Sequence, residues 1–213
     1  MTTKWKGAGN QIPPPFTNTE SIWTFCGCFL TLLLLLAYSD AISNVNPAYS
    51  LVTGPFGVSC IHLQASTRSA QVYTDSNILC FSSKALMTLQ YSLTAAPASQ
   101  PRNALLGQTI SLAIALGITY TSITTNLKKA LGTSLAICIM ARLGITHPPA
   151  GASAMLFSGG DYSWVHMAIM LGGNVIAILA ATVINDMNDR RQYPTTWGLG
   201  YWHKHFWKRS KEV

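Results

Sequence analysis

Long apolar runs dominate this sequence and restrict the solvent in which it can fold. Residues 22–38 contain five consecutive leucines, and three further apolar stretches cover residues 104–125, 130–145 and 164–185. A helix that crosses a bilayer needs about 20 mostly apolar residues. Charged residues are only 10% of the chain, against roughly 25% in soluble domains, so lipid is the expected solvent.

These runs predict an all-α fold, a polytopic membrane helix bundle of about four spans plus two broken or re-entrant half-helices. Residues 1–20 are polar and proline-containing and are predicted to be a disordered lead. Residues 21–187 form the transmembrane domain, and residues 188–213 form a basic, aromatic tail. A cleaved signal peptide is the alternative for the first run, but Asp40 near the cleavage region favours a retained span.

The net charge of +7 is concentrated near the two ends of the chain. Basic tails fit the cytoplasmic excess of Lys and Arg and attraction to anionic lipid headgroups, and nucleic-acid binding is not expected. Both termini are therefore predicted to face the cytosolic or an equivalent side. The four-span count places Lys128 and Lys129 on that side too.

Residues 62–90 lack a clear apolar run. Short apolar pieces alternate there with Ser, Thr, Gln and charged residues, without a helical or strand period. A segment with no apolar face to bury is not expected to offset the entropy lost on ordering. It is predicted to be a long, poorly ordered polar insert in the transmembrane domain, within a loop over 59–92 that contains some helix.

Two short segments share the pattern Pro-x-Gly-x-Ser followed by a small residue, at residues 55–60 and 149–154. Proline suits the first turn of a helix, and glycine lets a ligand or a backbone approach closely. Two half-helices starting near the middle of the membrane would aim two positive dipole ends at one place, which favours a small anion. The alternative is that these residues only mark turns between spans.

The candidate binding residues follow from this pattern. Backbone N–H groups after Pro149 would face the anion, Gly151 would leave space for it, and His147 can carry a proton near its ordinary pKa of about 6.5. The alternatives are that His147 bonds freed backbone, that Arg102 meets headgroups, and that Arg142 reaches the membrane surface. The full predicted set is Gly57, Ser59, Arg102, Arg142, His147, Pro148, Pro149, Gly151, Ala152 and Ser153.

Four motifs, in order, carry a resemblance to a known family. The stretch 146–154, Thr-His-Pro-Pro-Ala-Gly-Ala-Ser-Ala, resembles the signature of the HPP family of integral membrane proteins. Residues 54–57, 96–103 and 191–197 resemble its Gly-x-Phe-Gly, Gln-Pro-Arg-Asn and closing motifs. The resemblance covers residues 22–197 except about 62–90, a stretch that is either a genuine loop or a gene-model error. It implies a bundle of about four membrane helices and a role in nitrite transport, the activity assigned to plastid and cyanobacterial relatives.

The function expected is transport or channel conduction of a small anion, with nitrite as the anion that the resemblance implies. The alternative is a non-transporting scaffold or assembly protein, in which the Pro and Gly segments only shape the bundle. No Ser/His/Asp order, HExxH motif or P-loop occurs, so an enzyme is not expected. No cofactor and no metal is expected, homo-oligomer formation is left open, and the chain is placed in a membrane as a multi-pass protein.

Overall fold

A computed structural model describes residues 17–45, 85–188 and 191–196. These residues form helices, and no strand occurs among them. The helices are α1 (Asn18–Val45), an unlabelled helix over 85–92, the 3-10 turn η5 (Pro97–Ser99), α5 (Pro101–Thr119), α6 (Thr125–Leu143), α7 (Pro148–Gly159) and α8 (Trp164–Asp186).

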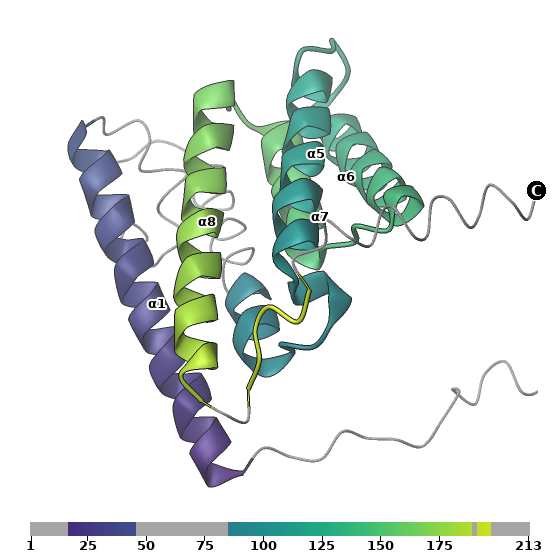
Figure 1. The fold of residues 1–213 in the computed structure, drawn as a ribbon. Coiled ribbons are helices and arrows are strands. Elements are labelled where there is room, and N and C mark those ends of the chain that lie inside the picture. The colour runs from purple at the N-terminus through teal and green to yellow at the C-terminus, as the bar shows by residue number, and fades with distance from the viewer. Residues whose placement is uncertain (1–16, 46–84, 189–190, 197–213) are drawn as a thin grey trace, which may run out of the picture.

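The helix α8 lies between α1 and a group made by α5, α6 and α7 (Figure 1). One apolar core joins α5, α6, α7 and α8, and a second joins α1, the helix over 85–92, α8 and Tyr193. The start of α1 and the end of α8 lie at the same end of the bundle (Figure 1). We call this the lower end, as it is drawn.

The outer faces of the bundle are apolar. Phe25 is 69% exposed and its ring stacks on that of Phe29 at 6.1 Å, while Val183 on α8 is 63% exposed. Such faces are costly in water and suit hydrocarbon. By length and composition, two helices of the described residues can cross a membrane, Asn18–Ile42 and Trp164–Asp186. The all-helical prediction is confirmed, whereas the count of four spans is not.

The helix α1 begins earlier than the predicted disordered lead allows. Thr17 and Glu20 form a reciprocal cap, in which the Thr17 N–H donates to Glu20 Oε2 at 2.8 Å and the Glu20 N–H donates to Thr17 Oγ1 at 3.3 Å. This Thr-x-x-Glu box satisfies N–H groups that a helix start leaves open. Residues 18–20 are therefore helical and Thr17 caps them, whereas residues 1–16 of the predicted lead lie outside the described residues.

The predicted polar insert also has a structured end. Within the helix over 85–92, Leu86, Met87 and Tyr91 are at most 4% exposed. Their apolar face packs on α1 and α8, so the expectation that this stretch has nothing to bury is wrong for its last residues. The part of the insert from 62 to 84 lies outside the described residues.

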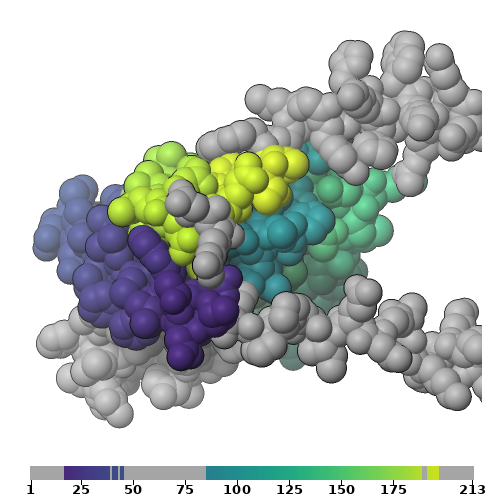
Figure 2. Space-filling model, turned by 60° about the horizontal axis from the view of Figure 1, so that its bottom comes forward, coloured from purple at the N-terminus to yellow at the C-terminus, as the bar shows by residue number. Residues whose placement is uncertain are grey.

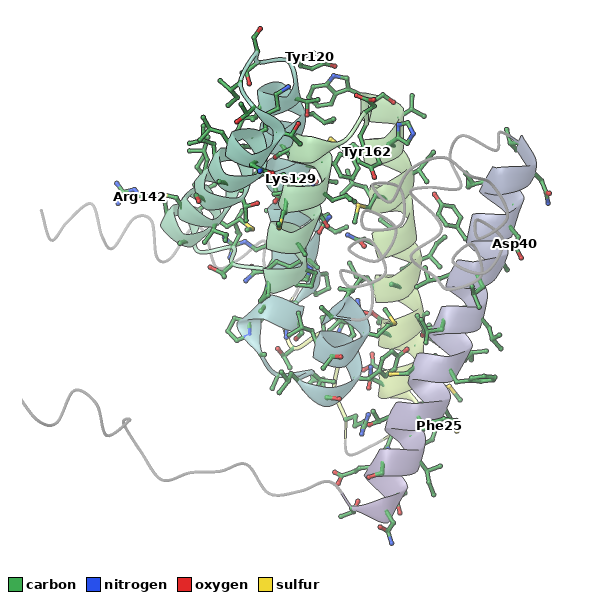
Figure 3. All side chains as sticks on the ribbon, turned by 180° about the vertical axis from the view of Figure 1, so that it is seen from behind. Phe25, Asp40, Tyr120, Lys129, Arg142 and Tyr162 are labelled. Atoms are coloured by element: carbon green, nitrogen blue, oxygen red, sulfur yellow. The ribbon has the colours of Figure 1, made fainter. Side chains whose placement is uncertain are left out.

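The two basic residues after the α5–α6 turn do not lie where the four-span count put them. Lys129 lies near the end opposite to Phe25, which marks the first half of α1 (Figure 3). The reason is that α5 runs away from the lower end, so the turn after α5 lies at the opposite end of the bundle (Figure 1).

Candidate functional site

The His-Pro-Pro motif forms the start of α7, directly after α6. Gly144 ends α6 with a φ of +66°, a left-handed conformation that glycine adopts at low cost. His147 then takes an extended conformation as the N-cap of α7, as expected for a residue before proline. Pro148 and Pro149 occupy the first two helical positions, where a missing N–H group is tolerated.

The imidazole of His147 is fully buried, with 0% of the residue exposed. Its Nδ1 lies 2.8 Å from the carbonyl oxygen of Ala98, and because a carbonyl only accepts, Nδ1 carries the hydrogen. The other ring nitrogen, Nε2, is buried and has no hydrogen-bond partner among the described residues. A buried polar atom without a partner is uncommon and costs about 1–3 kcal/mol, so it calls for an explanation.

Close packing of α5 on the turn before α7 fixes the position of His147. A Cβ atom added at Gly107 would lie 2.9 Å from His147 Cβ and 3.0 Å from the carbonyl oxygen of Ile145. Ser111, one turn further along α5, donates a hydrogen bond to the carbonyl oxygen of Ala150 at 2.5 Å. Glycine at 107 therefore lets the α5 backbone approach the motif, and Ser111 joins α5 to the first turn of α7.

The segment before α5 joins the His-Pro-Pro motif to the closing motif. Ala98 receives the His147 hydrogen bond, and the carbonyl oxygen of Ser99 accepts one from the Tyr193 hydroxyl at 2.8 Å. The side-chain oxygen of Gln100 accepts from the N–H groups of Thr195 at 3.0 Å and Thr196 at 3.2 Å. In Figure 2 the yellow atoms of 191–196 lie against α8 and the teal atoms that follow residue 85. Three motifs far apart in sequence therefore meet at residues 98–100.

Arg191 ties the closing motif to the start of α1. Its guanidinium donates to the carbonyl oxygen of Glu20 at 2.7 Å and to the Thr24 hydroxyl at 2.7 Å. The same group reaches the carbonyl oxygen of Tyr91 at 3.3 Å. A planar guanidinium can hold several acceptors at once, so this one side chain joins α1, the helix over 85–92 and the segment after α8.

Polar side chains from α5, α7 and α8 are buried between these helices. They are Asn103, Gln108, Ser111, Ser153, Ser158 and Asn174. Ser153 and Ser158 donate to carbonyls of their own helix, at 3.1 Å and 2.7 Å. Gln108 is 1% exposed, its nitrogen faces the Met170 sulfur at 3.6 Å, and its oxygen has no partner in the described parts of the chain.

The predicted residues of α7 are present at its start, but they act differently from the expectation. Pro148 and Pro149 have no N–H group, and the Ala150 N–H already bonds the His147 carbonyl at 3.0 Å. The first turn of α7 therefore has few donors left for an anion. A Cβ atom at Gly151 would lie 3.6 Å from Ile137 of α6, so this glycine faces a neighbouring helix rather than a ligand. Ala152 is half-buried.

The two predicted arginines do not join His147 in the same way. Arg102 is half-buried at the second position of α5, next to the motif junction. Arg142 is exposed, and its side chain points away from the bundle (Figure 3). Gly57 and Ser59, from the first copy of the predicted repeat, lie outside the described residues.

Gln108 and Ser111 were not among the predicted site residues. Both lie within the apolar stretch 104–125, three positions apart, which is the spacing of one helix face. Two polar residues on one face of a predicted membrane helix are a usable signal for a buried polar contact.

The Tyr193 hydroxyl offers a direct test of the junction. Tyr193→Phe should lower the free energy of unfolding by about 1–2 kcal/mol, because the buried Ser99 carbonyl loses its donor. Thermal unfolding in detergent measures the change. Tyr120→Phe is the control, because Tyr120 is 72% exposed. Equal melting temperatures for the two variants would show that the Tyr193 contact is energetically unimportant.

The geometry defines a helical membrane protein with a buried histidine at the start of an inner helix. Comparison with known proteins agrees: the family model described as HPP, transmembrane region, matches residues 63–194. The chain belongs to the HPP family of integral membrane proteins. The matched range begins inside the segment that was predicted to be an insert.

Two relatives from Dictyostelium discoideum, each named only as a transmembrane protein, are 25% identical over 206 residues. The match covers 91% of this chain and 62% and 56% of the two relatives, so the chain spans about three fifths of their length. No solved structure matches the chain.

Proposed function

We propose that this chain is a membrane transporter for a small anion, that nitrite is its substrate, and that His147 is the central binding residue. The observation that carries the proposal is the fully buried imidazole of His147. Its Nδ1 bonds the Ala98 carbonyl, and its Nε2 has no partner among the described residues. Ionisable side chains inside membrane bundles are costly, and they mark solute and proton pathways in many transporters. The proposal includes no chemical conversion of the solute.

The length of α7 supports the proposal. Its 12 residues give about 18 Å of helix, too short for a hydrocarbon layer about 30 Å thick. Figure 1 shows that α7 starts above the level at which α8 ends. A helix that begins inside a bundle is typical of transporters whose binding sites lie near the middle of the membrane. We propose that α1, α5 and α8 cross the membrane, and that α6 and α7 meet inside it, because only residues 144–147 separate the end of α6 from the start of α7.

The contacts among the motifs favour a scaffold or assembly protein as the alternative function. His147 and Tyr193 bond Ala98 and Ser99, and Gln100 accepts from the N–H group of Thr195. Such contacts could serve only to hold the bundle together, as in a scaffold or assembly protein. The two functions differ in whether a small anion binds, because a scaffold needs no solute.

Binding is tested by thermal unfolding of the purified protein in detergent, with sodium nitrite or with sodium chloride at equal ionic strength. Nitrite at 100 times its dissociation constant should add about 2.7 kcal/mol of stability. His147→Asn should remove this gain. A melting temperature that nitrite does not raise beyond chloride would favour the scaffold.

A further inference from the structure

The hydrogen bond to Ala98 fixes which ring atom of His147 faces a solute, and in which form. Nδ1 must carry a hydrogen, because its partner is a carbonyl oxygen 2.8 Å away. In the neutral imidazole the other nitrogen, Nε2, is then a lone-pair acceptor. The unpartnered atom of the site is therefore an acceptor unless a second proton is added to the ring.

A second side chain of the same core has the same need. The Gln108 oxygen is buried without a partner in the described chain, while its nitrogen faces the Met170 sulfur. Gln108 directly follows Gly107, the residue that packs on His147. Each of these two atoms accepts a hydrogen bond, so each calls for a donor of its own, and the donor at His147 Nε2 is the one considered next.

The charges around His147 do not suit a bare anion. The Ala98 carbonyl that bonds the ring and the Gly107 backbone that packs on His147 Cβ are both uncharged. Neither α7 nor the segment 94–100 contains an ionisable side chain. On the packed neighbours α5 and α6, the basic residues on this side are Arg102, at the start of α5, and Arg142, which points outward (Figure 3).

We propose that the solute occupies this site together with a proton, as a small monobasic weak acid whose hydrogen lies between its oxygen and His147 Nε2. This inference rests on the transport function proposed above. In one limit the neutral acid donates its O–H group to Nε2. In the other, that O–H bond breaks, an N–H bond forms at Nε2, and imidazolium holds the anion; the total charge of the pair is zero in both. On release, the proton leaves Nε2 with the anion.

The substrate class follows from this pairing. Nitrite and formate are conjugate bases of weak acids and can share a proton with an imidazole. Nitrate and chloride are conjugate bases of strong acids and hold a proton poorly, although nitrate is similar to nitrite in shape and charge. A site that requires the hydrogen should therefore discriminate strongly between nitrite and nitrate.

The test uses sealed vesicles that contain the full-length protein and a pH-sensitive dye, with protein-free vesicles as the background for passive permeation. An inward nitrite gradient should acidify the interior by one proton per nitrite taken up, independently of an imposed membrane potential. Formate should behave in the same way, and nitrate should enter at least about tenfold more slowly. These measurements use the unmodified protein, so they do not depend on the folding of a variant.

The outcomes separate the two proposals. Nitrite uptake that follows the membrane potential without acidification, or nitrate uptake at the same rate, would overturn proton sharing and leave the transporter standing. Nitrite uptake no faster than in protein-free vesicles would overturn both. Unchanged coupled uptake in His147→Asn would show that Nε2 takes no part in the coupling and would also overturn the inference.

Discussion

His147→Asn is expected to lower nitrite uptake by at least about tenfold while the protein stays folded. The asparagine amide can still donate to the Ala98 carbonyl, whereas it places no atom at the position of Nε2. Uptake into vesicles with equal amounts of inserted protein, and the melting temperature in detergent, give the two readings.

His147→Leu is the matched comparison, because leucine removes both ring functions. The Ala98 carbonyl then loses its donor, so the melting temperature should fall together with uptake. If His147→Asn transports nitrite as fast as the unmodified protein, Nε2 has no role in transport.

Gly107→Ala is expected to lower the free energy of unfolding by about 1–3 kcal/mol, the usual range for overpacking. The added methyl would lie 2.9 Å from His147 Cβ and 3.0 Å from a backbone oxygen, and backbone cannot move aside as a flexible side chain can. The same displacement should shift His147 and reduce nitrite uptake. Thermal unfolding and vesicle uptake measure the two effects.

Gly117→Ala on the same helix is the control. Nothing lies within 4 Å of the position that its Cβ would occupy. Alanine there should leave uptake unchanged and stabilise the helix by up to about 1 kcal/mol. Equal behaviour of the two glycine variants would contradict the close contact between α5 and His147.

The last helix follows closely from its apolar run. Residues 164–185 were predicted as the last span, and α8 runs from Trp164 to Asp186, because a long uninterrupted run leaves little choice. The sequence predicted some helix in this region but did not locate it at 85–92, since its buried face mixes Leu86 and Met87 with Gln90, whose amide bonds the Tyr193 hydroxyl at 3.5 Å. A polar residue that finds its partner 103 positions away breaks the period that sequence patterns rely on.

Some features of the candidate site could be predicted from the sequence, and others could not. His147 was predicted from its motif, and the structure shows that it is fully buried. The roles of Ala98 and Gln108 could not be predicted, because they depend on how α5 packs on the turn before α7. The expectation that the N–H groups after Pro149 face an anion fails because N–H groups beyond the first turn bond carbonyls of their own helix, and the two prolines leave the first turn itself with few donors.

Nitrite uptake into sealed vesicles, compared between the unmodified protein, His147→Asn and protein-free membranes, tests the central claim most directly. A transporter with His147 at its binding site should give uptake well above the protein-free background, and His147→Asn should return it close to that background at equal protein content. Uptake by the unmodified protein that does not exceed the protein-free background would contradict the claim.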